Sequence, residues 1–82
     1  MNSTNYAETE LRTLIKKVLA RNPNGLTFDY LRNELEEIEM IYVDGTKLRK
    51  IIAEMIREGT ICKEPSPQLK KFVLKLCKQL NK

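Results

Sequence analysis

The chain has 82 residues, of which 41% are hydrophobic and 32% are charged. This length fits one domain, residues 1–82, with one modest core, and the composition excludes both a disordered chain and a membrane protein. Because its apolar runs are short and its N-terminus lacks a secretory-signal pattern, we expect an intracellular, cytoplasmic protein without a membrane segment. The chain has no histidine, which excludes zinc fingers and histidine-based acid–base chemistry.

The first predicted element is a helix that starts at Asn5. Glu8 stands three residues after Asn5, as in a capping box, and apolar residues then follow at helical spacing as far as Leu19. The NPNG run at 22–25 combines a proline that cannot continue a helix with a glycine suited to a turn. We expect the helix to end there and Leu26 to form a one- or two-residue β-bridge.

The second predicted helix begins at Thr27, a residue that caps helix N-termini well. Apolar residues at helical spacing form one stripe along it: Phe28, Leu31, Leu35 and Ile38. Acidic residues occupy the side expected to face outward: Glu34, Glu36, Glu37 and Glu39. The MIYV segment at 40–43 follows as a partly buried connection.

The third predicted helix is capped by Asp44, opened by Gly45 and ended by Gly59. Four apolar residues point to one side at about 100° per residue, with Ile56 at the border of this face: Leu48, Ile51, Ile52 and Met55. The opposite side carries Thr46, Lys50, Ala53 and Arg57, and its flanks carry Arg49, Lys47 and Glu54. This helix is therefore amphipathic, with a cationic outer face.

The last elements are two β-rich runs, TICKE and LKKFVLKL, joined by a tip, EPSPQ. Pro65 and Pro67 disfavour continued ladder pairing, so we expect them at the tip of a hairpin. Phe72, Leu74 and Leu76 alternate with polar residues and should face the core, although Val73 breaks the pattern. Residues 1–4 and the tail at 77–82 are expected to be flexible or short terminal extensions of a core at about 7–76.

The two cysteines, Cys62 and Cys77, are too few for a disulfide framework. In a hairpin folded about the proline tip, Cys62 should face a position near Phe72 rather than Cys77. A reducing cytosol also disfavours a bond. We therefore expect buried or half-buried thiols.

The charge is divided unevenly along the chain. Residues 1–43 contain five Lys/Arg and seven Asp/Glu, whereas residues 44–82 contain ten Lys/Arg and four Asp/Glu. The third helix and the hairpin thus carry the excess positive charge. Such asymmetry indicates a surface that faces a polyanion.

A helix-turn-helix followed directly by a two-stranded hairpin resembles the winged-helix family over about residues 7–76, most clearly in DGTKLRKIIAEMIREGTICKEPSPQLKKFVLKL. The residues EG, I, EPSP and LKK are also similar to the C-terminal winged helix of archaeal minichromosome maintenance helicases. The resemblance implies an α+β, mainly α fold: a winged helix-turn-helix of three helices and a C-terminal β-hairpin wing. Stand-alone chains this short resemble those of archaea or their viruses.

The resemblance also implies binding to double-stranded DNA, typical of a transcriptional regulator. The third helix would enter the major groove and the wing would meet the phosphate backbone. The implied contacts are Thr46, Lys47, Arg49, Lys50, Arg57, Lys63, Lys70 and Lys71. Because one small domain covers little DNA, we expect a homodimer or a protein partner, with the first helix and the CKQLNK tail as dimer surfaces.

Other interpretations remain open. Cations opposite an apolar stripe also occur on any solvated helix, and lysines protect edge hairpins from aggregation. The acidic second helix and an exposed Met40-Ile41-Tyr42 segment suit a protein-interaction module of a transcription or replication complex. Single-stranded nucleic acid is a third option, disfavoured because Phe72 is expected in the core. We expect no enzymatic activity and no cofactor, because no catalytic constellation or Gly-rich phosphate loop is present.

Overall fold

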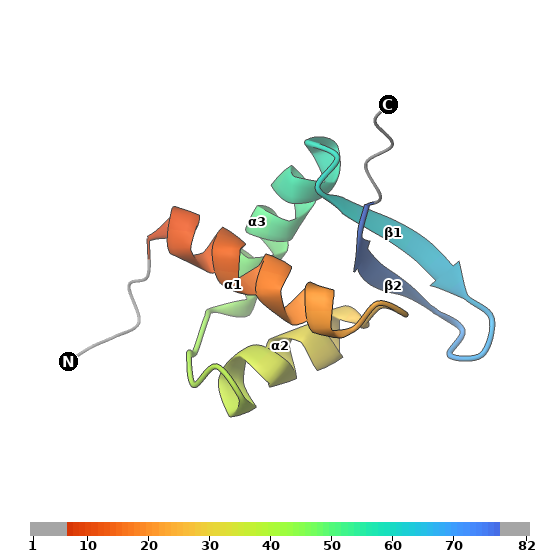
Figure 1. Ribbon diagram of the computed structural model, residues 1–82, viewed down its shortest axis with the longest axis horizontal. Coiled ribbons are helices and arrows are strands. Elements are labelled where there is room, and N and C mark those ends of the chain that lie inside the picture. Colours follow the sequence, from red (N-terminus) through yellow and green to blue (C-terminus); the bar gives the residue numbers. More distant parts are fainter. Residues whose placement is uncertain (1–6, 78–82) are drawn as a thin grey trace.

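The computed structural model describes residues 7–77, in which three helices precede an antiparallel hairpin (Figure 1). The elements in chain order are α1 (Glu8–Arg21), α2 (Phe28–Glu37), α3 (Gly45–Arg57), β1 (Ile61–Ser66) and β2 (Lys71–Leu76). The predicted α+β, mainly helical architecture and the order of its elements are confirmed. The predicted start of the first helix at Asn5 is wrong, because Ala7 is extended and α1 begins at Glu8. The other predictions for residues 1–6 and 78–82 lie outside the described residues.

The helix starts follow from the capping residues. The Thr27 hydroxyl accepts a hydrogen bond from the Tyr30 amide at 3.2 Å, and the Asp44 carboxylate accepts one from the Lys47 amide at 3.1 Å. Both side chains satisfy an amide that the first turn of a helix leaves without a partner. The predicted caps of α2 and α3 are therefore confirmed.

One core joins the three helices and the base of the hairpin. Its most deeply buried side chains include Ile15 and Val18 of α1, Leu31 of α2 and Leu48 of α3, which are completely enclosed. The predicted apolar stripe of α3 is confirmed. The stripe predicted for α2 is only partly confirmed, because its last member, Ile38, is 55% exposed. Since α2 ends at Glu37, the stripe stops at Leu35, and the buried Ile41 takes the next core position.

The hairpin projects from the helical body, with its turn at the far end (Figure 1). Its turn comprises residues 67–70, so the predicted tip is confirmed for Pro67 but wrong for Pro65. Pro65 lies inside the ladder and pairs with Phe72. Among the described residues β1 pairs only with β2, and on its other edge the missing N–H of a proline costs no ladder bond.

Near its base, the hairpin is covered on both faces. Leu74 packs in the core and pairs with Leu26, each donating an amide hydrogen bond to the other's carbonyl, which confirms the predicted bridge. On the opposite face, Val73 is buried against the turn at Gly25, where an added Cβ would lie 2.9 Å from the Val73 Cγ2 atom. Phe72 lies farther out and is 55% exposed, so its predicted place in the core is wrong.

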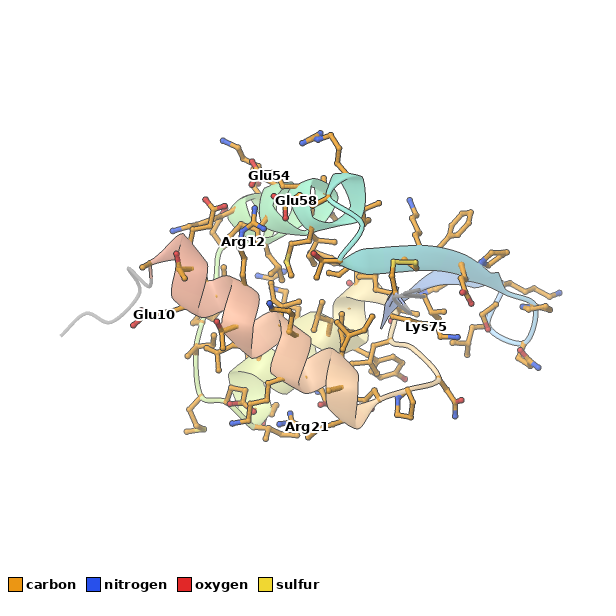
Figure 2. The ribbon with its side chains drawn as sticks, turned by 45° about the horizontal axis from the view of Figure 1, so that its top comes forward. Glu10, Arg12, Arg21, Glu54, Glu58 and Lys75 are labelled. Atoms are coloured by element: carbon orange, nitrogen blue, oxygen red, sulfur yellow. A yellow bond between two sulfur atoms is a disulfide. The ribbon has the colours of Figure 1, made fainter. Side chains whose placement is uncertain are left out.

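Cys62 and Cys77 form a disulfide, visible as a yellow bond in Figure 2. Cys62 pairs with Lys75 rather than with a residue near Phe72. The Cys77 amide donates a hydrogen bond to the Thr60 carbonyl, which places both cysteines on one face with their Cα atoms 5.0 Å apart. The prediction of free thiols is wrong, and Cys77 belongs to the hairpin base rather than to a terminal extension.

Candidate nucleic-acid interface

Arg12 of α1 forms ion pairs with carboxylates of α1 and of the C-terminal end of α3 (Figure 2). Its guanidinium donates hydrogen bonds to Glu8 at 3.1 Å, to Glu54 at 3.1 Å and to Glu58 at 2.6 Å. Glu54 lies on α3 and Glu58 is the C-cap residue of that helix. The two carboxylates at the end of α3 are thus held on the side that faces α1.

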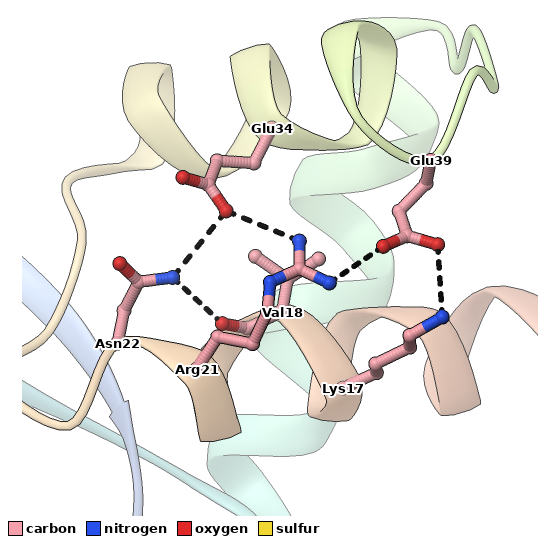
Figure 3. A network of polar contacts seen from close by, with 6 residues as sticks. All are labelled: Lys17, Val18, Arg21, Asn22, Glu34 and Glu39. Atoms are coloured by element: carbon pink, nitrogen blue, oxygen red, sulfur yellow. Dashed lines mark hydrogen bonds and ion pairs between the residues drawn. The ribbon is translucent and has the colours of Figure 1, made fainter.

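A second network ties α1 to α2 (Figure 3). Arg21 donates hydrogen bonds to Glu39 at 2.7 Å and to Glu34 at 3.2 Å, and Lys17 lies 3.4 Å from Glu39. The Asn22 side chain adds bonds to the Val18 carbonyl and to Glu34. Glu34 and Glu39, which were predicted to face outward, are therefore turned toward α1.

These networks shift the pKa values of two carboxyl groups downward. The hydrogen bond from Arg21 lowers the pKa of Glu39, and the hydrogen bond from Arg12 lowers that of Glu58. A depressed folded-state pKa gives stability that is complete above the unfolded value, about 4.3 for Glu, and is lost as the pH falls through the folded value. Both networks should therefore weaken in acid.

Acidification should accordingly lower the melting temperature of the wild-type chain more than that of a Glu39→Gln/Glu58→Gln variant. The measurement is thermal unfolding by circular dichroism from pH 6 to pH 3. Glu37→Gln, which alters an exposed carboxylate of α2, is the matched control and should retain the wild-type pH dependence. An unchanged pH dependence in the double variant would contradict a stabilising role for the two networks.

The outer face of α3 is cationic and without paired charges. Its members, here called the α3 basic face, are Thr46, Lys47, Arg49, Lys50 and Arg57, and all five are exposed. Within residues 7–77, no carboxylate forms an ion pair with any of its four cations. The structure thus brings together all the predicted contact residues of the third helix on one open surface.

The three predicted hairpin lysines do not share one surface. Lys63 is in β1 and pairs with Leu74, whereas Lys71 pairs with Ser66, so the two lysines point to opposite faces of the hairpin. Lys70 lies in the turn, with a φ of 56°. Only Lys63 lies beside the α3 basic face; Lys70 and Lys71 are at the far end of the hairpin.

A groove of about 400 Å³ separates α3 from the hairpin and is here called the α3–hairpin groove. Its apolar lining consists of Phe28, Ile52, Ala53, Ile56, Phe72 and Leu74. Two cations complete it: the Arg49 guanidinium lies 4.5 Å from the centre of the Phe28 ring, and the Lys63 ammonium lies 4.8 Å from that of Phe72. Both distances fit cation–π contacts.

The sequence interpretation assigned no functional role to the two rings of this groove. Phe28 and Phe72 were both assigned to the core from their spacing alone. Phe72 shares a hairpin face with the buried Leu74, so the alternation assigned its face correctly. Its exposure follows from its place two residues farther out along β2, which the period of a strand does not reveal.

The surface that the sequence predicted for a protein partner, the acidic second helix and residues 40–42, is only partly exposed in the structure. Glu34 and Glu39 are turned toward α1, and Glu36 forms an ion pair with Arg32 at 3.5 Å. Among the four acidic residues predicted to face outward, only Glu37 is exposed. Ile41 is buried at 5%, which contradicts an exposed Met40-Ile41-Tyr42 segment, while Met40 and Tyr42 are 78% and 61% exposed. An apolar rather than an acidic feature therefore dominates this end of α2.

Residues 7–77 contain no group of three or more His, Cys, Asp or Glu that could hold a metal ion. None of the described helices has the length and apolar character needed to cross a bilayer. No protein-family model, curated protein or solved structure matches the chain.

Proposed function

We propose that this chain is a winged helix-turn-helix protein that binds double-stranded DNA and regulates transcription. In this arrangement α3 enters the major groove, which is wide enough for a helix, and the hairpin is the wing. Lys47, Lys50 and Arg57 meet phosphates or base edges. Thr46 lies in the first turn of α3, where backbone amides also favour phosphate. Lys63, Lys70 and Lys71 contact the flanking backbone.

The observation that carries this proposal is the separation of charge. Arg12, Arg21 and Lys17 pair with carboxylates on the α1 side of the molecule, whereas the cations of the α3 basic face have no described ion pair. Unpaired cations on one exposed helix produce a local positive potential that attracts a polyanion. A merely solvated helix would mix both signs on its outer face.

One copy of such a domain buries about 600–1,000 Å² of its own surface against DNA, which limits its sequence specificity. We therefore propose that it acts as a homodimer or beside a protein partner. A symmetric dimer would read two half-sites separated by about one helical turn of DNA.

Salt dependence tests the proposal directly. If about five cations neutralise phosphates, the log–log slope of affinity against salt should be about −4 to −5, a loss of about 250- to 1,000-fold between 50 and 200 mM salt. The measurement is fluorescence anisotropy of a labelled mixed-sequence duplex titrated with the purified chain. Micromolar binding with this slope supports the proposal, and no binding at 50 mM salt overturns it.

A protein-interaction module of a transcription or replication complex is the second candidate. The exposed apolar side chains Ile38, Met40 and Tyr42, which lie close together in sequence after α2, favour it. This candidate places the functional surface on the α2–α3 connection instead of the α3 basic face. It predicts that charge changes on α3 leave the function intact.

A further inference from the structure

Phe72 occupies an unusual position for a large apolar side chain. It is 55% exposed and lies on the same hairpin face as Leu74 and Lys63, beside α3. Burying such a ring would gain free energy in proportion to the apolar area removed from water. Among residues 7–77, only the Lys63 ammonium is described over its ring. Phe72 is therefore available to a ligand with a flat apolar face.

The α3–hairpin groove favours a ligand that also carries negative charge. None of its lining residues is acidic, and Arg49 and Lys63 are both held beside its rings. Neither cation has a described carboxylate partner. A nucleotide combines the two required features, because a base has two π-faces and its phosphate is anionic.

We infer that the α3–hairpin groove binds one unpaired base, stacked on Phe72, with Arg49 and Lys63 on the adjoining phosphates. This inference rests on the proposed DNA-binding function and specifies its preferred substrate: duplex DNA that contains an unpaired nucleotide. Lys63 exchanges its contact with the Phe72 ring for a phosphate when the base arrives. The bases of a continuous duplex are stacked on one another, and extruding one costs least where it is already unpaired.

The stacking contact determines how much more tightly the chain should bind a bulge with a base than a bulge without one. Stacking of one base on an aromatic side chain corresponds to a loss of about five- to 150-fold in affinity when the ring is removed. The wild-type chain should therefore bind a duplex with a one-thymidine bulge more tightly, within this range, than the same duplex with an abasic bulge. The abasic bulge keeps the backbone charge and removes only the base.

Three variants of Phe72 test the stacking contact with the base. Phe72→Leu should reduce the ratio of affinities for the base bulge and the abasic bulge to about one, because it lacks the ring that stacks on the base. Phe72→Tyr keeps a ring and should preserve the ratio. Since the chain has three tyrosines but no tryptophan, Phe72→Trp introduces a single tryptophan that can be excited selectively, and its emission should be quenched by the base bulge and not by the abasic bulge.

The outcomes separate this inference from the proposed function. Equal affinity of the wild-type chain for both bulges, without quenching in Phe72→Trp, overturns the inference even where the continuous duplex binds with the expected salt slope. Such a result is the one expected of a groove that receives an apolar protein segment. Failure to bind any of the three DNAs at low salt overturns the proposed function and the inference with it.

Discussion

Reversing two charges of α3, Lys50→Glu/Arg57→Glu, should lower the affinity for a mixed-sequence duplex by at least about 100-fold at low salt. Both side chains are exposed on the α3 basic face and neither has a described ion pair, so each should contact the polyanion directly. Each reversal removes one attraction and adds one repulsion. The same anisotropy titration measures the effect, and the salt slope should become less steep by about two.

A matched variant separates local contact from net charge. Lys16→Glu makes the same change as Lys50→Glu at an exposed lysine of α1, outside the α3 basic face. If α3 contacts DNA, the Lys50→Glu variant should lose about tenfold more affinity than Lys16→Glu. Equal losses would mean that binding follows net charge alone, and no loss in either variant would favour the protein-interaction candidate.

The helical part of the fold was predictable because its signals are local. Thr27 and Asp44 cap the next turn of chain, and the stripe from Leu48 to Met55 repeats at the helical period. Both features depend only on residues within a few positions of one another. The exposure of the predicted α3 contact residues followed from the same periodicity, since residues opposite a buried stripe face solvent.

The hairpin was less predictable because its register depends on distant residues. Pro65 was placed in the tip from its usual effect on ladders, but a strand at the edge of a sheet tolerates it. The correct register aligns Thr60 with Cys77, and this alignment brings the cysteines together. A sequence pattern does not specify register where turn and strand boundaries are uncertain by a few residues.

The separation of charge was likewise inaccessible from the sequence. Glu54 and Glu58 lie among the cations of α3 in sequence, and only the packing of α1 brings Arg12 to them. These contacts join residues 42 and 46 positions apart. The net charge of the C-terminal half indicated a basic surface, whereas the pairing of Glu54 and Glu58 with Arg12 is a tertiary effect.

Loss of the Cys62–Cys77 bond should lower the free energy of unfolding by about 3 kcal/mol, the value for a closed loop of about 15 residues. The bond spans a sequence separation of 15 at the base of the hairpin, beside the core residue Ile61. For a domain of this size, the expected fall in melting temperature is about 12–24 °C. Thermal unfolding with and without dithiothreitol measures this fall.

The Cys62→Ala/Cys77→Ala variant supplies the control for this experiment, because its melting temperature should be low and indifferent to reductant. Thiol labelling of the native chain, read by mass spectrometry, shows independently whether the bond has formed. Disulfides persist in oxidising compartments and in the intracellular proteins of hyperthermophiles. A native chain with two labelled thiols, or a bonded chain whose unfolding ignores reductant, would contradict a stabilising disulfide. A bonded chain that melts lower when reduced would show that the disulfide stabilises the base of the hairpin that carries Lys63 and Phe72.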